Sequence, residues 1–63
     1  PNLRELNIGE NRIRDHGALA IIKHLSELEF LNLDRTEISS ESASLALKQL
    51  QRLKMFEIRW FYS

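Results

Sequence analysis

The residues that could do acid–base or metal chemistry are two histidines and a group of serines beyond the middle of the chain. His16 adjoins Asp15, a pairing that could orient an imidazole as a general base. Ser39, Ser40, Ser42 and Ser44 offer hydroxyl groups, but they lie where a helix is expected to begin, and no base is placed to activate them. His16 and His24 are eight residues apart, about 12 Å along a helix, which is too far for one metal ion. We therefore predict no catalytic residue, no cofactor and no metal site, and a chain that is not an enzyme.

The composition argues against several other classes of protein. The 63 residues carry nine basic and nine acidic side chains, so the net charge is zero, and we expect neither nucleic-acid nor membrane binding. Apolar runs fall far short of the roughly 20 residues of a membrane span. Without cysteine or an Asn-x-Ser/Thr sequon, the chain lacks two signs of secretion, and we expect an intracellular location. A chain this short without cross-links is marginal alone, so we expect it to belong to a longer chain or an assembly.

The sequence repeats itself with a period of 25 residues. A shift by 25 places aligns seven identical pairs: Leu3 with Leu28, Leu6 with Leu31, Asn7 with Asn32, Ile13 with Ile38, Ala18 with Ala43, Lys23 with Lys48, and Leu25 with Leu50. A second shift aligns Leu28, Leu31 and Leu33 with Leu53, Phe56 and Ile58. We predict a single segment with a first repeat at about 1–25, a second repeat at 26–50 and a partial third repeat at 51–63.

The apolar spacing changes within each repeat. Alternation at 6–8, 31–33 and 56–58 predicts three short strands. A spacing of i, i+3, i+4, i+7 predicts one helix in each full repeat, with core faces formed by Ala18, Ile21, Ile22 and Leu25, and by Ala43, Ala46, Leu47 and Leu50. We expect Asp15 to cap the first helix, and Ser39 or Ser40 the second. The fold class is therefore α/β, a solenoid whose parallel strands lie side by side with the helices behind them.

Leu3 to Ile13 follows the pattern L-x-x-L-x-L-x-x-N-x-L at every fixed position, and Leu28 to Ile38 follows it with Thr36 in place of Asn. The third copy departs from it at Phe61. The chain resembles leucine-rich repeat proteins, and its helical second halves resemble the ribonuclease-inhibitor-like class. The resemblance implies a horseshoe with the parallel sheet on its concave face and the helices on its convex face. It also implies protein binding by the strand residues that point away from the core.

Asn11 follows the first strand, and its side-chain amide can form hydrogen bonds with backbone groups of the turn. Stacked copies of such an asparagine would form a ladder between neighbouring repeats. Thr36 takes the equivalent place with a single hydroxyl. We therefore expect Thr36 to form a weaker rung of this ladder.

The strand positions outside the leucine pattern should form three columns: Asn7, Asn32 and Glu57; Gly9, Asp34 and Arg59; Glu10, Arg35 and Trp60. Neighbouring strands lie about 4.8 Å apart, so Asp34 can pair with Arg59, and Glu10 with Arg35. One interpretation is a binding patch with Trp60 as its aromatic anchor. The other is a solvated face whose charges neutralise each other. The predicted partner-binding residues are Asn32, Asp34, Arg35, Glu57, Arg59 and Trp60.

We therefore predict a non-enzymatic scaffold for protein–protein interaction that binds a protein through its concave face. Two alternatives remain: a structural segment buried in a large complex, and the targeting repeats of an enzyme such as a ubiquitin ligase component or a bacterial effector. Further repeats or a neighbouring subunit are expected at one or both ends. The aromatic run at 60–62 is either a lid over the end of the stack or a contact site.

Overall fold

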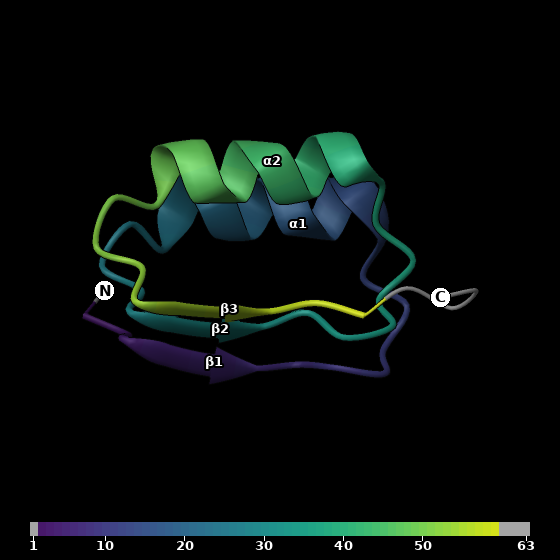
Figure 1. Cartoon of the computed structure of the whole chain (residues 1–63), viewed down its shortest axis with the longest axis horizontal. Coiled ribbons are helices and arrows are strands. Elements are labelled where there is room, and N and C mark those ends of the chain that lie inside the picture. The colour runs from purple at the N-terminus through teal and green to yellow at the C-terminus, as the bar shows by residue number, and fades with distance from the viewer. Residues whose placement is uncertain (1, 60–63) are drawn as a thin grey trace.

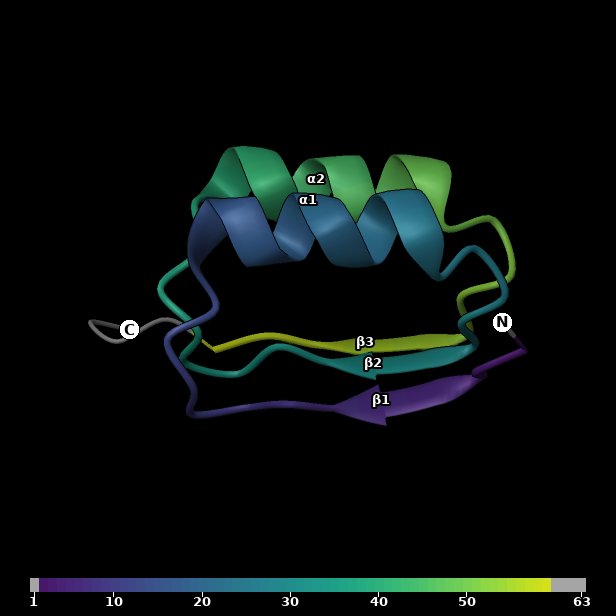
Figure 2. The same cartoon turned by 180° about the vertical axis from the view of Figure 1, so that it is seen from behind.

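The computed structural model describes residues 2–59, so Trp60 and the rest of the aromatic run lie outside the described residues. Strands and helices alternate along the chain: β1 (Glu5–Asn7), α1 (Arg14–His24), β2 (Phe30–Asn32), α2 (Ser40–Gln49) and β3 (Met55–Glu57). The two helices lie side by side over one face of a three-stranded sheet (Figures 1 and 2). The predicted α/β class, with parallel strands and the helices behind them, is confirmed.

The sheet places equivalent residues of the repeats beside one another. All strands are parallel, in the order β1-β2-β3, and Leu6, Leu31 and Phe56 are partners in register. The strands begin and end one residue earlier than predicted. Backbone bonding nevertheless continues past their ends, because the amide of Leu33 donates to the carbonyl of Glu57 at 2.8 Å. The 25-residue spacing therefore sets the register of the whole sheet.

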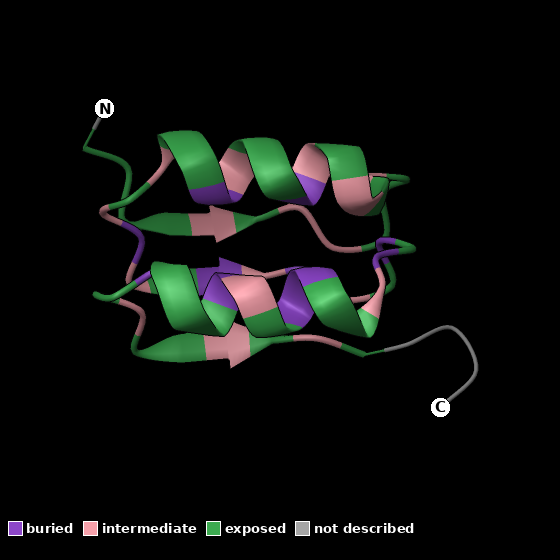
Figure 3. Ribbon diagram, turned by 90° about the horizontal axis from the view of Figure 1, so that it is seen from above, coloured by how far each residue is buried: buried purple, intermediate pink, exposed green. Residues whose placement is uncertain are grey.

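The core lies between the sheet and the helices (Figure 3). Both helices contribute buried residues to it, and most of the others lie on β2 or next to the second-repeat elements β2 and α2. The prediction that Leu47 belongs to the core is wrong, because this side chain is 62% exposed. Leu45 lines the groove that α2 shares with Leu19 and Ile22 of α1. Leu47 lies two residues further on, which is more than half a turn around the helix. It therefore lies on the flank of α2 that faces away from α1.

The two helices begin differently. Ser39 precedes α2 in extended conformation, and its hydroxyl accepts a hydrogen bond from the amide of Ser42 at 3.3 Å, which confirms Ser39 as the cap. The prediction that Asp15 caps α1 is wrong: the helix begins at Arg14, and Ile13 before it makes no side-chain capping bond. Asp15 therefore lies inside the first turn, where its carboxylate reaches the start of α2 instead of the start of its own helix.

Asn11 and Thr36 each bond the turn of their own repeat. The side-chain Nδ2 of Asn11 donates to the backbone carbonyls of Ile8 and Gly9 at 2.9 and 3.2 Å. The Thr36 hydroxyl donates to the backbone carbonyl of Leu33 at 2.8 Å. Asn11 thus makes two bonds where Thr36 makes one, as its extra donor predicts. The expected ladder between repeats is not formed by these side chains in residues 2–59. Backbone amides link the turns instead, including that of Arg14, which donates to the carbonyl of Thr36 at 2.8 Å.

Candidate functional site

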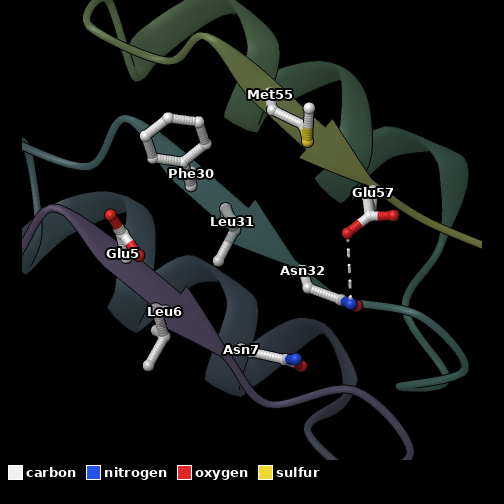
Figure 4. Close-up of a pocket in the computed structure, with 8 residues that line it drawn as sticks. All are labelled: Glu5, Leu6, Asn7, Phe30, Leu31, Asn32, Met55 and Glu57. Carbon is white, nitrogen blue, oxygen red and sulfur yellow. Dashed lines mark hydrogen bonds between the residues drawn. The ribbon is translucent and has the colours of Figure 1, made fainter.

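The sheet face opposite the helices, here called the open face, is covered by no other element within residues 2–59. Side chains alternate along a strand, so the leucines of β1 and β2 point to the core and their neighbours point outward. The outward residues form two rows across the strands, and these rows are shown in Figure 4. The first row is Glu5, Phe30 and Met55, and the second row is Asn7, Asn32 and Glu57.

The turns beyond the strands hold the two ion pairs that the column spacing predicts. Arg59 Nε lies 3.6 Å from Asp34 Oδ2, and Arg35 Nη1 lies 3.8 Å from Glu10 Oε2. The second oxygen of Asp34 is buried and receives no hydrogen bond from the described part of the chain. Glu10 and Arg35 are both largely exposed, so their pair contributes under about 1 kcal/mol to folding. In the other pair Arg59 is exposed, but only 14% of the Asp34 side chain is exposed. The two arginines thus remain free to exchange partners.

Asn7 and Asn32 have a structural task of their own. Their side-chain oxygens accept hydrogen bonds from the amides two residues further on, those of Gly9 (3.2 Å) and Asp34 (2.8 Å). The Asn32 amide group also donates to Glu57 Oε1 at 3.5 Å. A Cβ on Gly9 would lie 3.0 Å from the oxygen of Asn32. A glycine at position 9 therefore leaves room for the asparagine side chain that closes the next turn.

The ion pair between Glu10 and Arg35 joins two residues in the left-handed backbone region, with φ of 62° and 52°. This region costs a residue other than glycine about 1 kcal/mol or more. The exposed ion pair is too weak to explain why both residues adopt it. The turn that follows each strand imposes the conformation, since both residues take the equivalent place in their repeats. It also brings the two side chains together beyond the ends of β1 and β2.

Phe30 and Met55 belong to this surface and are absent from the predicted binding set. Their exposed fractions are 37% and 54%, and a shallow hollow of about 300 Å³ lies over the first and second rows. The repeat pattern treats the position before the inner leucine of each strand as variable. The sequence nevertheless contains a signal for these two residues. Alternation along a strand directs a large apolar residue at this position away from the core, and such a residue indicates a binding surface.

The described residues of the predicted binding set lie on β2, on β3 and in the segments that follow these strands. Asn32 and Glu57 occupy the second row, Asp34 and Arg59 follow in the same direction, and Arg35 lies in the turn beyond β2. Trp60, the predicted aromatic anchor, lies outside the described residues. The side chains of Phe30 and Met55 supply apolar surface at the opposite end of the same face.

Asp15 is an acceptor that joins the two repeats. Its Oδ1 accepts hydrogen bonds from the amide of Ser39 at 2.8 Å and from the hydroxyl of Ser42 at 2.7 Å. The pKa of Asp15 is lowered from its ordinary value, first by the Ser39 backbone bond and next by the Ser42 hydroxyl, with a smaller contribution from the charge of His16. The carboxylate therefore supports the start of α2, and no described contact directs it to act with His16 as a base.

Two further features of residues 2–59 bear on the chemistry. They contain no group of three or more acidic or histidine side chains that could hold a metal ion. No helix in this range has the length and apolarity needed to cross a membrane.

Comparison with known proteins bears on the first repeat. Residues 1–21 match the family model of the leucine-rich repeat. This match covers one third of the chain and supports its resemblance to leucine-rich repeat proteins. No curated protein and no solved structure matches it significantly. Leucine-rich repeats are commonly protein-interaction modules and are generally not enzymes.

Proposed function

We propose that the chain is a non-enzymatic protein-interaction scaffold that binds a protein partner through the open face. The observation that carries the proposal is an apolar pair, Phe30 and Met55, set in register beside polar rows on a face that no described element covers. Protein interfaces commonly combine an apolar centre with a polar rim in this way. The partner-binding residues of the proposal are Asn32, Asp34, Arg35, Glu57, Arg59 and Trp60, joined by Phe30 and Met55.

The apolar and charged parts of the face have different tasks in this proposal. The apolar pair supplies contact area that loses water on binding. The exposed arginines of the two ion pairs, Arg59 and Arg35, can exchange their partners at little cost, so they determine which charges a partner must present. Since the bonds of Asn32 already close its own turn, we assign it a smaller share of the binding energy than Arg59.

The architecture that goes with this function is a ribonuclease-inhibitor-like solenoid with the open face on its concave side. One helix behind each of the first two strands supports this class, because helices are wider than strands and a stack of such pairs curves toward the strands. The repeats at about 1–25 and 26–50 and the partial repeat at 51–63 are units of this solenoid. Further repeats would extend the open face in the direction of the strand order.

A random peptide library displayed against the full chain tests the proposed function. We expect selected peptides to lose about tenfold in affinity for a double variant, Asp34→Ala with Arg59→Ala, because both residues border the open face. The matched control is Lys23→Ala with Lys48→Ala, which changes charge on the helices and should leave the affinity unchanged. Selected peptides that respond only to the helix variants would contradict the proposal.

A structural role in a larger assembly is the second candidate, and the exposure of apolar residues at both flanks of the stack favours it. Leu3 precedes β1 and is 42% exposed, while Leu47 is exposed on the outer flank of α2. Contacts through these flanks would leave the open face free. Hydrogen exchange of a native complex separates the two candidates, since recognition protects β2 and β3 whereas a structural role protects the flanks.

A further inference from the structure

We propose that the first two rows of the open face bind an extended peptide segment in which one apolar side chain is flanked by lysine or arginine. The inference rests on the proposed function, because it names the chemistry of a partner for the same face. It concerns the end of the face where Phe30 and Met55 lie, away from the ion pairs of the turns. The hollow of about 300 Å³ over these rows is the place for the apolar side chain.

The charge of these rows is not neutralised by any ion pair within residues 2–59. The ion pairs of residues 2–59 join Glu10 to Arg35, Glu27 to Arg52, Glu29 to Lys54, Asp34 to Arg59, and Glu37 to both Arg12 and Arg14. Glu5 and Glu57 take part in none of them. Glu57 accepts only a long 3.5 Å hydrogen bond from the neutral Asn32 amide in this part of the chain. The hollow therefore has two carboxylates that pair with no cation in the described part of the chain.

The two carboxylates lie on either side of the apolar pair. Glu5 is the register partner of Phe30, one strand spacing of about 4.8 Å away. Glu57 lies two residues beyond Met55 on the same strand, a rise of about 6.6 Å. Glu5 and Glu57 are therefore about 12 Å apart, two strand spacings across the sheet and one two-residue rise along it. In an extended peptide, side chains four residues apart point the same way and lie about 13 Å apart. A peptide with cations two residues before and after an aromatic residue therefore matches the hollow.

The sign of the charge separates this partner from other ligands. A phosphate-bearing ligand, whether nucleic acid or lipid headgroup, would meet two unneutralised carboxylates at the hollow. A basic peptide would instead gain two ion pairs and bury apolar surface between them. Because exposed ion pairs are screened by salt, the charged part of the affinity must fall as ionic strength rises.

The probe is a peptide with the order serine, lysine, serine, phenylalanine, serine, lysine, serine and with both ends blocked. We expect its titration into the isotope-labelled full chain to shift the amide resonances of Glu5, Phe30, Met55 and Glu57 in a saturable manner. A double variant, Glu5→Gln with Glu57→Gln, should bind about tenfold more weakly at low salt, and this difference should shrink at high salt. The matched control is Glu41→Gln on α2, another carboxylate outside the ion pairs of residues 2–59, which should bind like the parent chain.

A second set of substitutions tests the apolar contact between the probe and the hollow. Replacing phenylalanine by alanine in the probe, or Met55→Ser in the chain, should each weaken binding about tenfold. Circular dichroism of each chain variant checks that it keeps its fold. Equal binding of a probe with glutamate in place of both lysines, or no saturable shifts on the open face, would overturn this inference. If library-selected peptides still map to the open face in that case, the proposed function stands and only the partner chemistry is wrong.

Discussion

The first and second repeats carry identical residues at equivalent positions, yet they bury them to different extents. Leu28 is 0% exposed, whereas Leu3 is among the exposed apolar residues, and Leu50 is buried while Leu25 is only half-buried. The difference follows from the position of β2, which lies between β1 and β3, while β1 has a neighbouring strand on one side only within residues 2–59. Burial in this fold is therefore a property of the neighbouring repeats as much as of the residue.

On the outer flank of α2, the residue of the second repeat is less buried than its equivalent in the first repeat. Ile22 is 6% exposed because α2 covers it, while its equivalent Leu47 lies on the uncovered side of α2. The helix starts differ in the opposite direction, because α2 receives the carboxylate of Asp15 from the repeat before it. Each repeat is thus stabilised by its neighbours. Substitutions at equivalent positions test this mutual support, beginning with the largest expected effect.

Leu28→Ala should lower the free energy of unfolding by about 3 kcal/mol, because it leaves a cavity between the sheet and the helices. Leu3→Ala, the same change at the equivalent exposed position, should cost less than about 1 kcal/mol. Urea unfolding followed by circular dichroism measures both values. Equal losses in the two variants would show that the second repeat is not the better packed of the two.

Ser42→Ala should cost about 1 kcal/mol, because it removes the buried hydroxyl that donates to Asp15. Ser44→Ala, an exposed site on the same helix with the same gain in helix propensity, is its control and should stay within about 0.5 kcal/mol of the parent chain. When Asp15→Asn is already present, Ser42→Ala and Ser44→Ala should change the free energy of unfolding by more similar amounts. If Ser42→Ala keeps its full effect there, the hydroxyl does not act through the carboxylate.

The stability of the chain should depend on pH through Asp15. The folded pKa is lowered by the bonds from Ser39 and Ser42, so the contribution is fully present above the ordinary value of 3.8 and is lost as pH falls through the lowered pKa. Thermal unfolding between pH 2 and pH 6 should show this loss, and Asp15→Asn should remove that part of it. A variant whose pH profile matches the parent chain would assign the acid sensitivity to other carboxylates.

The smallest effect is expected at the outer flank of α2. Leu47→Gln should change the free energy of unfolding by no more than about 0.5 kcal/mol, because the side chain is already mostly in water. Ile22→Ala, at the equivalent position of the first repeat, should cost about 2 kcal/mol or more. A large loss for Leu47→Gln in thermal unfolding would mean that this flank is covered in solution.

The 25-residue period was enough to predict the strands, the helices, the register and both ion pairs at the turns. These features follow from spacing, since equivalent residues of parallel neighbours come side by side. The partner of Asp15 could not be predicted, because it depends on helix α1 beginning one residue before it. The exposure of Leu47 and Phe30 could not be predicted either. It depends on whether another element covers the outer flank of α2 or the open face of the sheet, and apolar periodicity does not encode that information.

The central claim is that the open face binds the partner, and a nuclear magnetic resonance footprint of the full chain with a library-selected peptide tests it most directly. We predict that the resonances shifted on saturation belong to Phe30, Asn32, Met55, Glu57 and Arg59, and that those of the helices stay unchanged. Shifts gathered on the outer faces of α1 and α2, with the open-face resonances unmoved, would contradict it.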